Sequence, residues 1–185
     1  MFNSNRIRRI GPFTIDKSCS VILHHMTAYI EVDGMRLRRK VRAVVINDDG
    51  DVLLVRPHGY CDGEWTLAGG GVENGESPVA AMRRELAEEL GIDLEVGLEE
   101  LPVTNRFIYS QEHKAKRALD HDGQDAVMFA CKVGKNITLR LQAEEVADAR
   151  WFAGHCVIDL VTLLLGTGSY CTPQRRRMTD DDICR

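Results

Sequence analysis

Three glutamates, Glu85, Glu88 and Glu89, form the group of side chains in this sequence that is best placed to carry out chemistry. An α-helix turns by about 100° per residue, so on a helix these carboxylates share one face within an arc of roughly 100°. Three like charges so close together destabilise a helix unless a positive charge compensates them. Mg²⁺ and Mn²⁺ prefer hard carboxylate oxygens. The spacing therefore fits either a divalent metal site or a solvated acidic helix face.

The residues around the glutamates favour the metal site. Ser77 and Pro78 are typical of a helix N-cap and first helical position, and Gly91 is typical of a helix end. Between them, apolar residues recur at helical spacing and predict a buried stripe of Val79, Met82, Leu86 and Leu90. Three consecutive glycines at 69–71 allow the backbone to bend sharply and to approach another group closely. We expect the helix to pack by its apolar stripe and to direct the carboxylates at this glycine loop.

Length and composition indicate one globular domain. The chain has 185 residues, of which 44% are hydrophobic and 28% are charged, and its formal net charge is −4. This balance produces no strong field toward nucleic acid or anionic membranes, and no apolar run approaches the roughly 20 residues that span a bilayer. The six cysteines are widely spaced and form no CxxC pair, which argues against a zinc ribbon or a thioredoxin-type motif. We expect reduced thiols and a cytoplasmic protein.

The chain divides into three segments of different character. Residues 1–25 contain several arginines but a single acid, and they show no lasting periodicity. They fit a disordered leader, a working protein that starts at Met26, or an organelle transit peptide. Residues 26–165 alternate β-like and helical patterns and form the predicted domain. Residues 166–185 carry a run of arginines and then a run of aspartates, and we expect a mobile tail.

Period-two and apolar runs predict strands on both sides of the helix. Residues 28–32 and 35–37, joined by Asp33-Gly34, are typical of a hairpin. Further strands are predicted at residues 41–46, 52–55, 65–67, 101–109, 126–133, 137–141 and 150–152, with a helix at 157–165. Residues 56–63 are interpreted as a loop and 110–123 as a long polar segment. The basic residues of segment 36–42 are interpreted as a solvated strand edge, with contact to phosphates as the alternative.

The stretch GGVENGESPVAAMRRELAEELGI at residues 70–92 resembles the complete signature of the Nudix hydrolases. Gly70, Glu76 and the run 84–92 fill every fixed position of that pattern, whereas Ala68 stands where many members have proline. The resemblance implies the α/β class, with a Nudix-type α/β/α sandwich around a mixed β-sheet. It also implies hydrolysis of a nucleoside diphosphate linked to another group, with Mg²⁺ or Mn²⁺.

The resemblance further implies roles for single residues. It suggests a set of metal ligands, namely Glu85, Glu88, Glu89 and the Gly70 carbonyl. Arg84 and Glu76 would form a supporting ion pair that fixes the glycine loop against the helix. Outside the signature, Glu145 is similar to a further catalytic glutamate of several members, with Glu144 as the alternative. A carboxylate beside a metal-activated water can take its proton, and both Glu89 and Glu145 are candidates for this base.

Substrate choice depends on residues outside the signature. The candidates for substrate binding are Arg56, Tyr109, Lys114, Arg117 and Gln124. Gln124 and Tyr109 resemble positions of bacterial members that act on dinucleoside polyphosphates or RNA 5′ ends, although Tyr109 also fits a simple strand aromatic. The basic side chains near residue 115 either clamp phosphates or belong to a solvated loop. Three substrate classes stay open: a nucleoside triphosphate, a dinucleoside polyphosphate or RNA 5′ end, and a nucleotide sugar such as ADP-ribose.

Two alternatives to a hydrolase remain. A non-catalytic Nudix nucleotide-binding module would be expected to lack one of the carboxylates, and all three are present. A diphosphate isomerase of related fold would need a cysteine in its pocket, for which Cys61 is the candidate. Many relatives pair through the sheet or the N-terminal strands, so we expect a homodimer.

Overall fold

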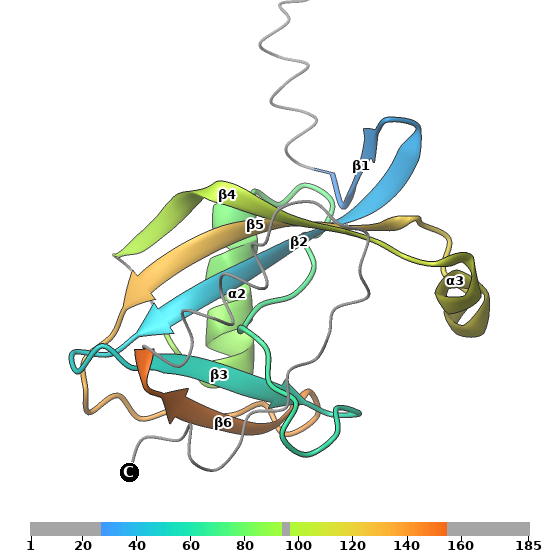
Figure 1. The fold of residues 1–185 in the computed structure, drawn as a ribbon. Coiled ribbons are helices and arrows are strands. Elements are labelled where there is room, and N and C mark those ends of the chain that lie inside the picture. Colours follow the sequence, from blue (N-terminus) through green and yellow to red (C-terminus); the bar gives the residue numbers. More distant parts are fainter. Residues whose placement is uncertain (1–26, 94–96, 155–185) are drawn as a thin grey trace, which may run out of the picture.

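The computed structural model describes residues 27–93 and 97–154, which form a six-stranded mixed sheet with α2 against one face (Figure 1). The described strands are β1 Tyr29–Val32, β2 Met35–Ile46, β3 Val52–Pro57, β4 Leu98–Ile108, β5 Gly123–Lys132 and β6 Val146–Phe152. The described helices are α2 Pro78–Leu90 and α3 Gln111–Arg117. The predicted leader 1–25, helix 157–165 and tail 166–185 lie outside the described residues.

The sheet has the strand order β4-β5-β2-β3-β6, and β1 pairs with β2 outside this path. β2 and β5 run parallel, whereas the other pairs are antiparallel. This confirms the predicted α/β class with a mixed sheet. The β1–β2 hairpin forms as predicted, since Asp33 and Gly34 take the positive φ angles of 51° and 76° that its tight turn needs.

The β2 strand corrects two predictions. It runs unbroken for 12 residues, where the sequence suggested two separate strands, because the basic residues between them continue the ladder with β5. The prediction of a solvated strand edge is also wrong, because β2 lies between β5 and β3 in the middle of the sheet. Five basic side chains therefore occupy one of the most central strands of the described sheet.

Two apolar clusters cover the C-terminal half of β2 on its two faces. On one face, Val41, Ala43 and Val45 pack in the same cluster as Met82, Leu86 and Leu90 of α2. On the other face, Val44 and Ile46 pack with Leu54, Met128 and Phe152. This two-sided burial explains why the strand is almost continuously apolar here.

Helix α2 begins and ends where the sequence predicted. The Ser77 side chain accepts a hydrogen bond from the backbone N–H of Ala80, and Gly91 takes the left-handed conformation with φ 67°. Met82, Leu86 and Leu90 are buried as expected, but Val79 is 37% exposed. Val79 has the right helical angle, yet it lies in the first turn of the helix and joins neither described core cluster.

The predicted strand at 137–141 is wrong. The segment instead passes the C-terminal end of α2, where the backbone N–H of Arg140 donates to the carbonyl of Leu90 at 2.8 Å and that of Gln142 donates to Glu89 at 3.1 Å. These bonds satisfy carbonyls that the helix end would otherwise leave unpaired. The predicted strand at 65–67 is reduced to an isolated bridge between Thr66 and Val55 of β3.

The polar segment 110–123 contains the short helix α3, which Ser110 caps by accepting a hydrogen bond from the N–H of His113 at 3.1 Å. α3 and the β1–β2 hairpin lie at the same end of the sheet (Figure 1). Within the described residues, no helix is both long and apolar enough to cross a membrane.

Candidate functional site

The glycine loop lies between two strands that diverge. β2 and β3 pair through only two residues each near their shared turn. Farther along, the backbone N–H of Val41 donates to the Gly70 carbonyl at 3.0 Å, while Val55 and Thr66 exchange two hydrogen bonds of 2.9 Å. The segment before α2 therefore fills the gap between β2 and β3, and both strands hold it in place.

The first and third glutamates of α2 face this loop. The Gly69 N–H donates to Glu89 Oε2 at 2.8 Å, and a Cβ added to Gly70 would lie 2.2 Å from Glu85 Oε1. Both glutamates are only 7% exposed. The buried face of α2 thus brings two carboxylates against a backbone that has no side chains, as the sequence suggested.

Gly70→Ala is expected to lower turnover by about 10- to 100-fold, because the new methyl group displaces the Glu85 carboxylate. Gly70 has no positive φ, so the backbone tolerates alanine and the melting temperature should change little. Gly134→Ala is the matched control, since its Cβ would meet nothing within 4 Å. Steady-state kinetics and thermal melting of both variants check this prediction, and unchanged turnover in Gly70→Ala would contradict it.

Arg84 connects the helix to the loop. Its guanidinium binds Glu76 through two hydrogen bonds of 3.0 and 3.1 Å, and it donates to the Gly71 carbonyl at 2.9 Å. It also donates to Glu85 at 3.0 Å and to Glu88 at 2.9 Å. The ion pair that the sequence suggested between Arg84 and Glu76 is present, and the same side chain additionally holds two of the three helix glutamates.

Burial changes the protonation of the two helix glutamates that face the glycine loop. Desolvation raises the pKa of Glu89 to about 7, although the Gly69 N–H and Arg42 act in the opposite direction. Glu85 and Glu145 contribute to the same rise by charge repulsion. Burial likewise raises the pKa of Glu85. Two buried carboxylates that resist ionisation together would be stabilised by a nearby cation.

The donor set fits a divalent cation chemically. Carboxylate and carbonyl oxygens are the ligands that Mg²⁺ and Mn²⁺ prefer. In the described residues, however, no three acids, histidines or cysteines are grouped closely enough to hold a metal ion. Arg84 binds Glu85 and Glu88 instead. The Gly70 carbonyl accepts from Val41 and keeps one lone pair. A bound cation would therefore compete with Arg84 for two carboxylates.

Glu145 lies on the turn before β6, and it is exposed. Its charge contributes to the environment of Glu89, whereas Glu144 is not among the causes of the Glu89 shift. The backbone hydrogen bonds from segment 140–142 to the end of α2 bring this turn to the helix. This proximity supports Glu145 over Glu144 as the additional acid.

The predicted substrate-binding residues separate into two groups. Arg56 forms an ion pair with Asp62 at 3.4 Å, and Lys114 forms one with Asp122, so both are engaged by acids. Tyr109 and Gln124 lie nearer the basic residues of β2. Gln124 pairs in register with Arg38. Burial raises the pKa of Tyr109, and the charge of Arg42 opposes this rise. The charge of Arg117, at the end of α3, likewise opposes the rise in the pKa of Tyr109.

The sequence interpretation preferred a solvated strand edge for the basic side chains of β2, with phosphate contact as the alternative, and did not place them beside the glycine loop. Arg42 donates to the Gly69 carbonyl, and Arg38 donates to Val72 at 2.6 Å. Lys40 interacts electrostatically with Glu85 and Glu89. Their alternation with buried residues was the signal that could have revealed them, since alternate positions share one face of a strand.

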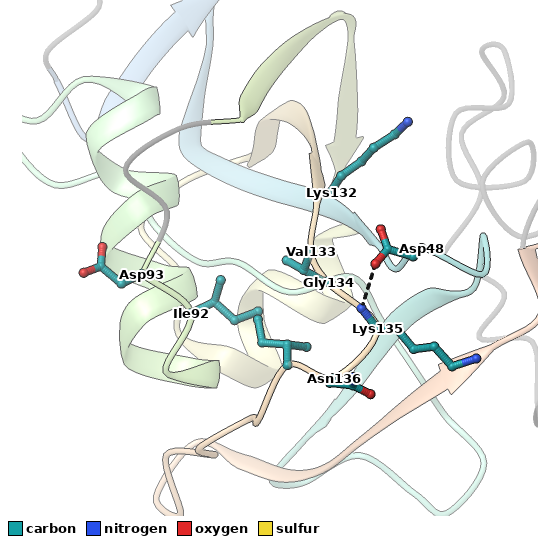
Figure 2. A pocket seen from close by; sticks show the side chains of 9 residues that line it. Asp48, Ile92, Asp93, Lys132, Val133, Gly134, Lys135 and Asn136 are labelled. Carbon is teal, nitrogen blue, oxygen red and sulfur yellow. Dashed lines mark hydrogen bonds between the residues drawn. The ribbon is translucent and has the colours of Figure 1, made fainter.

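A hollow of the described surface lies away from the helix glutamates. Figure 2 shows a space of about 480 Å³ between the turn after β2, the end of β5 and the residue that follows α2. Lys135 lines this hollow, its backbone N–H donates to Asp48 at 3.1 Å, and its ammonium pairs with Asp49 at 2.7 Å. No predicted catalytic or substrate-binding residue of the described part lines it.

The described structure thus combines a mixed sheet, a glycine loop held between two of its strands, and a helix that directs two buried carboxylates at this loop. The NUDIX domain pattern matches residues 36–160. The chain belongs to the Nudix family, and it is a Nudix hydrolase.

Two curated relatives carry names that describe activity. Nucleoside triphosphatase NudI of Escherichia coli O139:H28 is 34% identical over 123 residues, covering 62% of this chain and 81% of that protein. An RNA pyrophosphohydrolase of Aeromonas hydrophila is 43% identical over 61 residues, covering 33% of this chain and 34% of that protein.

Solved structures share the fold. The E. coli dihydroneopterin triphosphate pyrophosphohydrolase has a TM-score of 0.56 and 20% identity, over 70% of this chain and 86% of that one. The NUDIX domain of Shewanella oneidensis NrtR, complexed with ADP ribose, has a TM-score of 0.51 and 22% identity, over 66% of this chain and 77% of that one.

Proposed function

We propose that this chain is a metal-dependent pyrophosphohydrolase that cleaves a nucleoside triphosphate into a nucleoside monophosphate and pyrophosphate. The observation that carries this proposal is the convergence of the buried Glu85 and Glu89 on the glycine loop, with Arg84 linking both parts. The similarity to nucleoside triphosphatase NudI supports the substrate class.

The metal ligands in this proposal are Glu85, Glu88, Glu89 and the Gly70 carbonyl. Mg²⁺ or Mn²⁺ held by these oxygens would neutralise phosphate charge and lower the pKa of a bound water. Arg84 orients Glu85 and Glu88, and its bonds to Glu76 and the Gly71 carbonyl keep the loop close to the helix. The glycines leave room for phosphate oxygens to approach the backbone.

Glu89 and Glu145 are the two candidates for accepting a proton from the attacking water. The pKa of about 7 for Glu89 suits a group that takes up and releases a proton near neutral pH. Glu145 is the exposed partner of this pair and can reach water without opening the core. Proton transfer of this kind contributes about 10²- to 10⁴-fold to turnover.

A triphosphorylated RNA 5′ end is the second candidate substrate, supported by the identity to an RNA pyrophosphohydrolase over the region of the signature. ADP-ribose remains a weaker alternative, because the structure with that ligand is a fold relative only. A non-catalytic binding module is disfavoured by the complete carboxylate set. The isomerase alternative has little support, since Cys61 is exposed. The homodimer and the cytoplasmic location stay predictions.

A substrate panel tests the proposal. Nucleoside triphosphates, a dinucleoside polyphosphate, triphosphorylated RNA and ADP-ribose are incubated with the protein and Mg²⁺, and nucleoside monophosphate, pyrophosphate and phosphate are quantified. The proposal expects the highest kcat/KM with a nucleoside triphosphate and release of pyrophosphate. A clear preference for ADP-ribose, or release of orthophosphate from the triphosphate, would overturn it.

A further inference from the structure

The glycine loop depends on partners outside itself for its shape. Three consecutive glycines have no side chains that could pack, and glycine loses more conformational freedom on folding than any other residue. The Gly69 carbonyl accepts a hydrogen bond from Arg42, and the Gly71 carbonyl accepts one from Arg84 at 2.9 Å. Bonds to the sheet on one side and to α2 on the other therefore keep the loop in place.

Arg38 holds the point at which the chain leaves the glycine loop. Its Nη1 donates to the carbonyl of Val72 at 2.6 Å and to the carbonyl of Ala28 at 2.9 Å. Val72 is buried, and its own N–H donates to the carbonyl of Arg39 at 3.1 Å. Because Ala28 directly precedes β1, one guanidinium nitrogen joins the exit of the loop to the start of the first described strand.

Asn74 completes this connection from the segment that leads from the loop to α2. Its side-chain oxygen accepts a hydrogen bond from the backbone N–H of Ala28 at 2.9 Å. Ala28 is buried, so both of its backbone polar groups need partners inside the protein. Asn74 and Arg38 supply partners for the N–H and the carbonyl respectively.

The surroundings of Arg38 orient its guanidinium for these bonds. The guanidinium carbon lies 5.2 Å from the ring centroid of Tyr29, its cross-strand partner in β1, which is within the range of a cation–π contact. A Cβ added to Gly71 would lie 2.5 Å from Arg38 Nη2, so the guanidinium occupies space that a side chain at Gly71 would fill. Among the described residues, no acid forms an ion pair with Arg38.

A shift of the loop would reach the helix glutamates directly. The Gly69 N–H donates to Glu89 at 2.8 Å, and a Cβ added to Gly70 would lie 2.2 Å from Glu85 Oε1. Val72 follows these glycines, so the position of its carbonyl limits the path that they can take. Displacing reacting groups by about 1 Å can lower turnover by about 10²-fold, even when the substituted residue is remote from them.

We propose that Arg38 and Asn74 are positioning residues, which hold the exit of the glycine loop to the start of β1 through Ala28. Both act through the backbone of the loop, and neither has to touch the substrate. The inference rests on the proposed hydrolysis at the helix glutamates. It extends the site beyond the signature at 70–92, because Arg38 and Ala28 precede it and Asn74 occupies a position that it leaves variable.

Amide hydrogen exchange of the metal-free full chain, followed by NMR, tests this without turnover. Arg38→Gln should speed exchange of the Val72 amide about tenfold or more, and Asn74→Ala about threefold or more. Asn74→Asp should restore the wild-type rate, because a carboxylate oxygen accepts the same hydrogen bond from Ala28. The amide of Leu54 in β3 should exchange at the wild-type rate in all variants, which separates local loosening from a general loss of stability.

Kinetics with a nucleoside triphosphate supply the second measurement. Arg38→Gln should lower kcat about tenfold and Asn74→Ala about threefold, with KM within about twofold of the wild type, and Asn74→Asp should recover kcat.

Arg36→Gln is the matched control for both measurements. Arg36 lies two positions from Arg38 in β2 and contacts the same Tyr29 ring at 4.0 Å, but its guanidinium bonds to Asp120 and not to the loop. It should leave the exchange of the Val72 amide and kcat unchanged, because an exposed ion pair contributes little.

Unchanged Val72 exchange in both Arg38→Gln and Asn74→Ala, or an equal rise at Leu54, would overturn the inference. A higher KM alone in Arg38→Gln, with Asn74→Ala silent, would also overturn it, since Arg38 would then contact the substrate. If Arg38→Gln does not fold, the two variants of the exposed Asn74 decide. If the wild type hydrolyses no substrate, the proposed function fails, while the exchange rates still decide whether Arg38 and Asn74 hold the loop.

Discussion

Glu89→Gln is expected to lower the turnover of a nucleoside triphosphate by about 10²- to 10⁴-fold. The substitution removes the charge of a carboxylate that we assign to the metal site and that is also a candidate base. Glutamine can still accept the 2.8 Å hydrogen bond from the Gly69 N–H, so the glycine loop should keep its position. The loss should therefore appear in kcat and in metal affinity rather than in folding.

The same substitution should stabilise the metal-free protein above neutral pH. The pKa of Glu89 is about 7 in the folded chain, above its ordinary value of 4.5. Between pH 4.5 and about 7 the folded state therefore keeps a proton on Glu89 that the unfolded state has released. The contribution of this group to the free energy of unfolding is fully present below pH 4.5 and is lost as pH rises through about 7. The loss amounts to at most about 3 kcal/mol.

Urea unfolding in EDTA at pH 5 and pH 8 measures this effect. Wild type should lose free energy of unfolding between the two pH values, and Glu89→Gln should lose distinctly less. Glu73→Gln, at an exposed acid before the helix, is the control and should match the wild type in stability and in turnover. A Glu89→Gln protein with near-normal kcat, or with the full pH dependence of the wild type, would refute the role given to this carboxylate.

Arg84→Ala should destabilise the protein by about 2–4 kcal/mol. It removes hydrogen bonds to Glu76, Glu85, Glu88 and the Gly71 carbonyl and leaves carboxylates without their cation. The Arg84 side chain is 26% exposed, so solvent compensates part of this loss and the effect stays below that of a fully buried pair. Turnover should fall as well, because the loop and the helix lose their connection.

Arg83→Ala provides the control for Arg84→Ala. Arg83 is the neighbouring residue of the same helix, and it should change the free energy of unfolding by no more than about 0.5 kcal/mol. Arg84→Lys keeps the charge but lacks the planar fork that binds Glu76 through two nitrogens, so it should recover only part of the stability. If Arg84→Ala and Arg83→Ala unfold at the same urea concentration, the linking role of Arg84 is wrong.

The sequence was most informative where local chemistry decides the structure. The ends of α2 depend on Ser77, Pro78 and Gly91, each of which acts within a few residues, and the structure agrees with them. The orientation of Glu85 and Glu89 then followed from helical periodicity. The hairpin at Asp33-Gly34 is another local feature that was predicted correctly.

Features that depend on distant partners could not be predicted in the same way. The basic residues 36–42 fit an exposed strand edge until β5 is known to pair with β2 along most of its length. Segment 137–141 has the residues of a strand, but the free carbonyls at the end of α2 take its N–H groups. Val79 matches the apolar stripe, yet it belongs to neither described core cluster.

The most direct test of the central claim is ³¹P NMR of a nucleoside triphosphate incubated with the protein and Mg²⁺. The account predicts resonances of pyrophosphate and nucleoside monophosphate. These products should not form when EDTA is present from the start, and they should form far more slowly with Glu88→Gln. Hydrolysis that is unaffected by Glu88→Gln, or no hydrolysis of any triphosphate by the wild-type protein, would contradict it.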